Sequence, residues 1–262
     1  KATGTCTISM DGWTYGQTAK SPSSTTTTDS KSVSYTYYDS AGTSLGATRP
    51  SNAGTYSVTA TWAATTNYNA CTSSKKQFVI AKATGSVTAA VKTGTFTYNG
   101  SAHTIATVSA NTGTYYFGFG SSSTSAPSSW GTANSAATAT NAGTYYVWVK
   151  CDTSTNYNAV AAKYVGSVTI NKATGFVDAN LLTQTWSGSA QNVATIKSNS
   201  GDYYLGLGSS STSAPSSWTK NGALTAKNVG TYYIWAKCDA STKYNAVSQY
   251  YVGTATINKA RG

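Results

Sequence analysis

The chain has 262 residues, and its 18 Lys and Arg side chains against seven Asp and no Glu give a formal net charge of +11. The basic residues are spread along the chain and form no arm or stripe, which argues against a nucleic-acid-binding surface. Thr, Ser, Tyr, Gly and Val are abundant whereas the helix-favouring Glu is missing, so the composition predicts an all-β protein with almost no helix.

An internal repeat divides the chain into three parts. The phrase Lys-Ala-Thr-Gly begins at Lys1, Lys82 and Lys172, and a partial echo occupies residues 259–262. Each part is somewhat shorter than the roughly 100 residues of an immunoglobulin-like sandwich and can bury one modest core. We expect three tandem β-sandwich domains: repeat one (1–81), repeat two (82–171) and repeat three (172–262). Because no flexible spacer separates them, we expect an elongated, semi-rigid rod.

Repeat one contains short stretches with the alternation of half-buried strands. We expect strands at 5–9, 33–37 and 77–80. The tract 21–30 consists almost wholly of Ser and Thr, and we expect it to be a loop. Asn67-Tyr68-Asn69-Ala70 should form a turn before the closing strand.

The segment 141–152 recurs in near copy at 52–63 and 228–239. Each copy begins with Asn-x-Gly, which suits a tight turn, and then alternates, so each should be a corner that feeds a strand. In the middle copy the apolar face, predicted to face the core, carries Tyr145, Val147, Val149 and Cys151. The first tyrosine of each copy either forms the tyrosine corner of immunoglobulin-like sandwiches or serves packing alone. The corner residues are Tyr56, Tyr145 and Tyr232.

Repeats two and three share a segment, Gly-Ser-Ser-Ser-Thr-Ser-Ala-Pro-Ser-Ser-Trp, at 120–130 and 208–218, which repeat one lacks. If this serine-rich loop binds something, repeat one should not. The strand before it should point its large residues inward, which leaves Gly118 and Gly120 on the other face. A glycine pair in a strand exposes bare backbone against which something large can lie.

Trp148 and Trp235 point outward from the corner strands and allow two interpretations. They could cover the strand glycines from across the sheet. Alternatively, they could join Tyr146 and Tyr233 in an exposed aromatic contact patch, because Tyr and Trp are frequent in recognition surfaces.

The cysteines become informative when the repeats are compared, because four cysteines alone allow three pairings. Where repeat one has Cys6 and Cys71, the other repeats have valine pairs: 87 with 160, and 177 with 247. Two positions that are both apolar in two copies and both Cys in the third should be neighbours that point inward on the first and last strands. We therefore predict a Cys6–Cys71 disulfide, as in exported proteins, worth a few kcal/mol.

Cys151 and Cys238 are equivalent to each other and to Trp62 of repeat one, always on the inward face. We expect both to behave as small buried hydrophobic side chains. A bond between them would have to join two separately packed domains, which the required geometry disfavours.

Residues suited to catalysis or metal binding are few. The one histidine, His103, should begin a strand, and its counterpart in repeat three is Gln191, so the repeats share no catalytic histidine. The seven Asp are dispersed, and no sequence motif has the ligand spacing of a zinc or calcium site. We expect no enzymatic activity, no cofactor and no metal. A Lys–Asn isopeptide bond is disfavoured because Glu is missing and Asp152 faces outward.

Three motifs together resemble bacterial immunoglobulin-like repeats of the MBG and YDG type. They are the Asn-Ala-Gly-Thr-Tyr corner at 141–145, the Asn-Tyr-Asn-Ala turn at 156–159, and the closing strand Val-Thr-Ile-Asn-Lys-Ala at 168–173. The resemblance covers all three repeats and implies a large surface adhesin of gut Firmicutes, similar in kind to superantigens that bind host antibodies. It specifies the module better than the ligand, because such repeats serve as stalks and as binding units.

The resemblance implies a non-enzymatic segment that binds a host macromolecule, such as immunoglobulin, through an edge strand or an aromatic sheet face of repeats two and three. Two alternatives remain open: a passive stalk that presents another domain, and a module that binds mucin glycans through Trp130 and Trp218. The candidate ligand-binding residues are Tyr146, Trp148, Tyr233, Trp235, Trp130 and Trp218.

The expected location is extracellular, on the bacterial cell surface or secreted. Both ends of the chain fall within the repeated phrase, so we expect a piece of a longer protein whose signal and anchor lie elsewhere. No apolar run approaches the about 20 residues of a membrane span, and we expect a monomer that does not insert into membranes.

Overall fold

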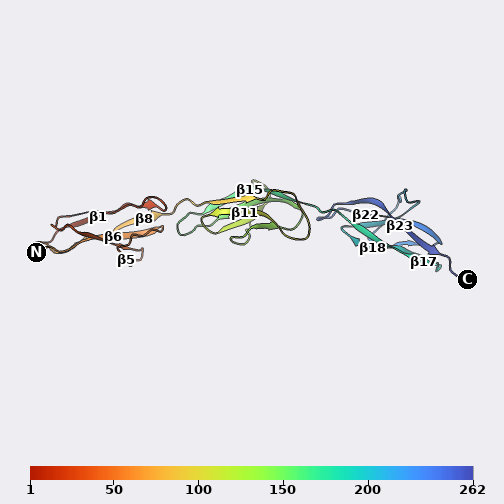
Figure 1. Ribbon diagram of the computed structural model, residues 1–262, viewed down its shortest axis with the longest axis horizontal. Helices are drawn as coiled ribbons and strands as arrows, with labels where there is room; N and C mark the ends of the chain where they lie inside the picture. Colours follow the sequence, from red (N-terminus) through yellow and green to blue (C-terminus); the bar gives the residue numbers. More distant parts are fainter. Residues whose placement is uncertain (262) are drawn as a thin grey trace. The chain divides into compact units, whose positions relative to one another are not determined.

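The computed structural model describes residues 1–261, which form strands, turns and loops and contain no helix (Figure 1). The all-β prediction is confirmed. The described residues form two compact units. Unit 1 contains Lys1–Val91, Ala106–Ala137 and Tyr146–Gly166, and unit 2 contains Lys92–Ile105, Thr138–Tyr145 and the described chain from Ser167 onward. This boundary runs across repeat two, so the three-domain rod stays a prediction.

Repeat one is a β-sandwich with one large and one small sheet. Its strands are β1 (Cys6–Ser9), β2 (Trp13–Thr14), β3 (Ser23–Thr26), β4 (Val33–Tyr38), β5 (Ser44–Gly46), β6 (Gly54–Trp62), β7 (Cys71–Thr72) and β8 (Lys76–Ala81). The sheets are β1-β3 and β2-β8-β6-β4-β5, with β7 paired to β6. In the core, the rings of Trp13 and Phe78 stack at 5.5 Å, and Ile8 of the small sheet packs against this cluster.

The expectation that 21–30 is a loop is wrong, because Ser23–Thr26 forms β3 and pairs antiparallel with β1. Thr is β-branched and favours strands, although a Ser/Thr tract lacks the apolar alternation by which a strand is recognised. The hydroxyl oxygens of Thr7 and Thr25 lie 2.7 Å apart across the pair, so polar side chains help to join these strands.

Repeat two contributes strands to both units. They are β9 (Val87–Val91), β10 (Phe96–Thr97), β11 (His103–Asn111), β12 (Tyr115–Gly120), β13 (Ala137–Ala139), β14 (Gly143–Cys151) and β15 (Val160–Asn171). Their sheets are β13-β11-β9 and β10-β15-β14-β12. In β14 the predicted inward residues Val147, Val149 and Cys151 are 0%, 0% and 1% exposed, which confirms the predicted face.

Repeat three is a sandwich of two sheets, β16-β18-β21 and β17-β23-β22-β19-β20. Val193 of β18, Leu205 of β19 and Ile234 of β22 are fully buried in one core between the sheets. The strands are β16 (Val177–Leu181), β17 (Thr183–Thr185), β18 (Gln191–Asn199), β19 (Tyr203–Gly208), β20 (Thr219–Lys220), β21 (Leu224–Ala226), β22 (Gly230–Cys238) and β23 (Val247–Asn258).

The predicted inward residues of β12 and β19 pair with core residues of β14 and β22, such as Phe119 with Val147 and Leu207 with Ile234, but they are not all buried. Phe117 is 5% exposed and Leu205 is fully buried, but Phe119 is 41% and Leu207 is 36% exposed. Both exposed residues lie next to the last residue of their strand, where the chain leaves the sheet for the serine-rich loop.

The tyrosine corners are confirmed in all three repeats. Each hydroxyl donates to the carbonyl oxygen of the Asn four residues earlier: Tyr56 to Asn52 at 3.1 Å, Tyr145 to Asn141 at 2.7 Å, and Tyr232 to Asn228. The corner therefore ties the start of β6, β14 and β22 to the preceding turn.

The predicted disulfide and the burial of the other two cysteines are also confirmed, but Cys71 lies on β7 and not on the last strand, and both bonded cysteines are half-buried. Cys6 and Cys71 form a disulfide that joins β1 to β7. Cys151 and Cys238 are free, and they are 1% and 2% exposed. Among residues 1–261 we find no apolar helix of membrane-crossing length.

Candidate functional site

The serine-rich loop folds back over the glycine face of the strand that precedes it. A Cβ atom at Gly118 would lie 2.6 Å from the Pro127 Cγ atom, and one at Gly120 would lie 2.2 Å from the Ser125 carbonyl oxygen. Contacts this short leave no room for a side chain, so the glycines allow the loop to lie directly on the β12 backbone.

Trp148 lies beneath this loop. It pairs with Gly118 across the strands, and its Nε1–H donates to the carbonyl oxygen of Ser122 at 3.1 Å. The Tyr164 ring packs beside the Trp148 indole, with the two ring centroids 5.8 Å apart. Only 8% of Trp148 is exposed, because the loop covers an indole that faces away from the sandwich core.

Repeat three builds the same arrangement. Trp235 pairs with Gly206, donates to the Ser210 carbonyl oxygen at 3.1 Å, and is 8% exposed. The interpretation that the tryptophans cover strand glycines is confirmed for the second glycine of each strand: an added Cβ atom would lie 2.6 Å from the Trp148 Nε1 atom at Gly120 and 2.4 Å from the Trp235 Nε1 atom at Gly208. Prolines of the loops cover the first glycines, Gly118 and Gly206. The exposed aromatic patch needs correction: Tyr146 and Tyr233 are half-buried, but both indoles are covered by a loop whose packing cannot be inferred from strand alternation.

Trp130, at the end of the loop, is half-buried and borders a lysine. The Lys150 Nζ atom lies 5.2 Å from the Trp130 ring centroid and 5.0 Å from that of Tyr116, which is its cross-strand partner. Asp152 completes this group, 3.8 Å from Lys150. Burial and the nearby Asp152 carboxylate raise the pKa of Tyr116.

The equivalent group in repeat three consists of Tyr204, Trp218, Lys237 and Asp239. The Lys237 Nζ atom lies 4.8 Å from each ring centroid, and the Tyr204 hydroxyl donates to the Asp239 carboxylate at 2.8 Å. This hydrogen bond is the main cause of a raised Tyr204 pKa. We call the two groups the lysine–aromatic clusters; one lies in each unit.

Sequence reasoning named Trp130 and Trp218 but missed the lysines and tyrosines of these clusters. The strand alternation did offer a signal, because it places Tyr116 and Lys150 on the outward, mixed-polarity faces of two adjacent strands. Finding the pair requires the register of β12 against β14, which the sequence does not give directly.

Addition of a peptide strand beside β12 is blocked. The Gly131 N–H donates to the Phe117 carbonyl oxygen at 2.8 Å, and the Asn134 N–H donates to that of Tyr115 at 2.9 Å. In repeat three the short β20 pairs with the same edge of β19. Binding through these two edges is therefore unsupported, whereas the sheet faces remain candidates.

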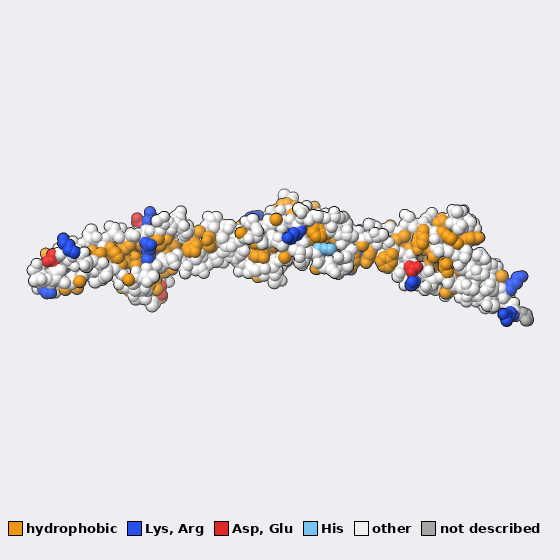
Figure 2. Space-filling view, viewed as in Figure 1, with side chains coloured by type: hydrophobic (Ala, Val, Ile, Leu, Met, Phe, Trp, Pro, Cys, Tyr) orange, Lys and Arg blue, Asp and Glu red, His pale blue; other side chains and the backbone are white. Residues whose placement is uncertain are grey.

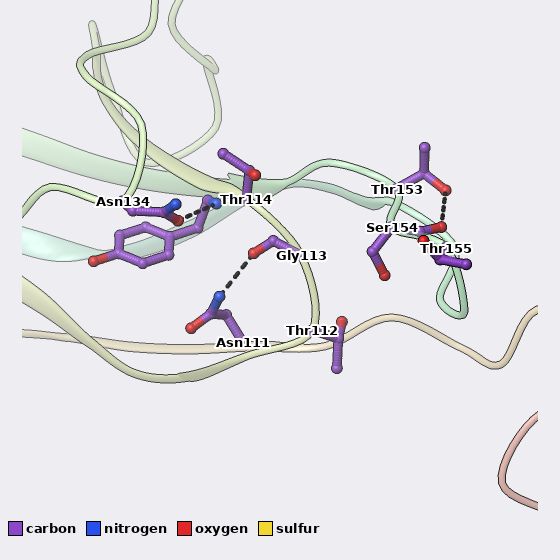
Figure 3. Close-up of a pocket in the computed structure, with 9 residues that line it drawn as sticks. Asn111, Thr112, Gly113, Thr114, Asn134, Thr153, Ser154 and Thr155 are labelled. Carbon is purple, nitrogen blue, oxygen red and sulfur yellow. Dashed lines mark hydrogen bonds between the residues drawn. The ribbon is translucent and has the colours of Figure 1, made fainter. Parts of the chain in front are cut away.

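A polar pocket of about 660 Å³ lies at the other end of β12, between Asn111, Asn134 and Ser154 (Figure 3). Its amides mainly hold the backbone: Asn134 Oδ1 accepts the Tyr115 N–H at 3.1 Å, and Asn111 Nδ2 donates to the Gly113 carbonyl oxygen at 2.7 Å. The counterpart in repeat three, about 760 Å³, adds the carboxylates of Asp202 and Asp239. The two pockets therefore differ in charge.

Asp202 forms an ion pair with Lys220 at 2.6 Å and accepts a hydrogen bond from Asn221 at 2.9 Å. The Lys220 hydrogen bond, followed by that of Asn221, lowers the Asp202 pKa, and the same pairing raises the pKa of Lys220. Asp202 is thus held in its charged form as a partner of β20.

His103 has a structural counterpart in Gln191. The His103 Nε2 atom lies 3.0 Å from the Thr97 carbonyl oxygen, and Gln191 Nε2 donates to the Thr185 carbonyl oxygen at 2.9 Å. Because a carbonyl oxygen only accepts, His103 carries its hydrogen on Nε2 here. Within residues 1–261, no group of three or more His, Cys, Asp or Glu is placed to hold a metal ion.

Charged side chains are sparse on the face shown in Figure 2, where the Lys and Arg side chains stand mostly apart.

No protein-family model matches the chain, and no curated protein matches it. The assignment to MBG and YDG repeats therefore stays a prediction from the motifs.

Proposed function

We propose that this chain is a non-enzymatic binding segment of a bacterial surface or secreted protein, and that repeats two and three contact a host macromolecule through their lysine–aromatic clusters. The observation that carries the proposal is that each unit presents a half-buried tryptophan beside a lysine held between two rings. Repeat one, which lacks the loop, takes no part in this contact.

The chemistry of the clusters suits macromolecular recognition. Trp and Tyr bury large areas at small entropic cost, and they dominate the residues whose loss weakens interfaces most. The lysine adds a positive charge, in keeping with the net charge of +11, which favours approach to acidic surfaces. Host immunoglobulin, the ligand that the motif resemblance implies, is the first probe.

The experiment is a binding titration with the full chain immobilised. Purified serum immunoglobulin and mucin are passed over it, each before and after enzymatic removal of glycans. Saturable binding of deglycosylated immunoglobulin supports the proposal, whereas binding that disappears with the glycans would identify a carbohydrate module instead. Absence of saturable binding to every fraction would contradict it and favour the passive stalk.

Trp148 and Trp235 favour the stalk as a second candidate. Both indoles are used inside the fold to cover strand glycines, so they offer little surface to a ligand. A stalk requires only this stabilising role. The two candidates differ at Trp130 and Trp218, whose loss should affect binding only if the clusters form the contact.

A further inference from the structure

The tyrosine of the Asn-Tyr-Asn-Ala turn in repeat two packs against repeat one within unit 1. The rings of Tyr157 and Tyr15 meet edge to face with centroids 5.4 Å apart. The neighbouring Asn156 side chain accepts the Ala53 N–H at 2.8 Å and donates to Asn52 Oδ1 at 3.1 Å. The turn therefore contacts an aromatic ring and the Asn-Ala-Gly corner.

Unit 2 contains the same contact one repeat later. The rings of Tyr244 and Tyr98 meet edge to face, again with centroids 5.4 Å apart. Lys243 takes the place of Asn156, and its Nζ atom lies 5.3 Å from the Tyr98 ring centroid. The turn thus recurs together with the aromatic ring on which its tyrosine packs. We call this ring, Tyr15 in repeat one and Tyr98 in repeat two, the receptor ring.

The receptor ring has a defined place in the fold. Tyr15 and Tyr98 each follow a short strand that runs parallel to the last strand of the repeat, β2 along β8 and β10 along β15. Each donates its N–H to the carbonyl oxygen of the final residue of that last strand: Tyr15 to Ala81 at 2.8 Å and Tyr98 to Asn171 at 2.9 Å.

Trp186 holds this place in repeat three. It follows β17, which runs parallel to β23, and its N–H donates to the Asn258 carbonyl oxygen at 2.9 Å. Its side chain is 45% exposed. Val229, the counterpart of Ala53 in the corner, is 44% exposed and precedes Gly230, which pairs with Ile257. Two exposed apolar side chains therefore flank the end of β23.

We propose that Trp186 and Val229 form a docking surface for the Asn-Tyr-Asn-Ala turn of a further repeat of this kind. The tyrosine of that turn packs edge to face on the Trp186 indole, and the polar residue before it contacts the corner at Asn228. Two contacts within this chain, at Tyr15 and Tyr98, establish the chemistry of the partner.

Such a contact is small and depends on covalent connection. An aromatic pair contributes little beyond its buried area, too little to hold two separate chains together. A short connection raises the effective concentration of the turn to about the millimolar range, in which a weak contact can form. The test therefore uses linked copies.

The experiment joins residues 1–258 of one copy to a complete second copy, so that Lys1 of the second directly follows Asn258 of the first. This preserves the spacing of Lys82 after Ala81 and of Lys172 after Asn171. Tyr68 supplies the turn of the second copy. The second copy also carries Trp186→Phe, so that hydroxyl-radical footprinting with mass spectrometry reads only the Trp186 of the first. We expect its oxidation rate to fall at least threefold relative to the single chain.

Two variants of the second copy distinguish docking from simple crowding. Tyr68→Phe keeps the ring and should keep the protection, whereas Tyr68→Ala should restore the rate of the single chain. Trp218, read together from both copies because its peptide is the same in each, is the internal reference and should oxidise at the same rate in every protein. Unchanged Trp186 oxidation in the linked protein would overturn the proposal, and so would protection that survives Tyr68→Ala.

Discussion

At the residue scale, the glycines of β12 and β19 decide what lies on the outer face of the sheet. Without side chains at Gly118 and Gly120, the loop can approach the strand and enclose the Trp148 indole. In repeat three, Gly206 and Gly208 allow the same close approach, and Trp235 lies beneath the loop. Aromatic side chains on the outward face therefore contribute to stability here.

Trp148→Ala should destabilise the fold, because it removes a side chain that is 8% exposed and leaves a void under the loop. We expect a loss of about 3 kcal/mol, the lower end of the range for buried Trp→Ala. Chemical denaturation measures it. Trp186→Ala is the matched control, since this tryptophan is 45% exposed and its loss should cost much less. Equal losses for the two variants would contradict the buried role of Trp148.

Asp202 should make stability depend on pH. Lys220 lowers its pKa in the folded chain, so its contribution is present above the ordinary carboxyl pKa of about 3.9 and is lost as pH falls through the lowered value. The stability difference between the natural chain and Asp202→Asn, followed by denaturation, should shrink from pH 7 to pH 2.5. Thr114→Asn, at the equivalent position in repeat two, is the control. A difference that stays constant with pH would show that the ion pair is unimportant.

At the element scale, the strands with clear apolar alternation were predictable, and the corner is the best example. Its alternation predicted the buried face of β14. The positions of Tyr56, Tyr145 and Tyr232 directly after the turn predicted the hydrogen bonds from their hydroxyls to that turn. β3 was missed because hydroxyl side chains join it to β1 in place of an apolar face.

The candidate site was predictable only in part. Comparison of the repeats identified the serine-rich loop and Trp130, but not the position of the loop over Trp148, which depends on the close approach of Pro127 to Gly118. The place of Lys150 between two rings depends on strand register and on the path of the loop. Neither strand register nor the path of a loop produces a hydrophobic periodicity that can be recognised in the sequence.

The Cys6–Cys71 disulfide should stabilise repeat one by restricting its unfolded chain. The bonded residues are 65 apart in sequence, for which chain entropy predicts about 4 kcal/mol. Replacing both with Val copies the pairs found in the other repeats and keeps an apolar contact without the bond. Hydrogen exchange of the β6 amides should accelerate in this double variant. Dithiothreitol should accelerate it in the natural chain but not in the variant; equal exchange in all four samples would contradict the prediction.

At the scale of the whole molecule, each unit carries one lysine–aromatic cluster on one serine-rich loop. Two equivalent contacts on one chain can raise the apparent affinity for a ligand that reaches both. The single variants Trp130→Ala and Trp218→Ala should therefore each weaken binding less than the double variant does.

The most direct test of the account is the dissociation constant for immunoglobulin, measured for the natural chain, the Trp130→Ala/Trp218→Ala double variant, and Trp186→Ala as an exposed-tryptophan control. The proposed contact predicts that the double variant loses at least tenfold in affinity with its denaturation midpoint nearly unchanged, and that Trp186→Ala binds like the natural chain. A double variant that stays folded and binds with undiminished affinity would contradict the account.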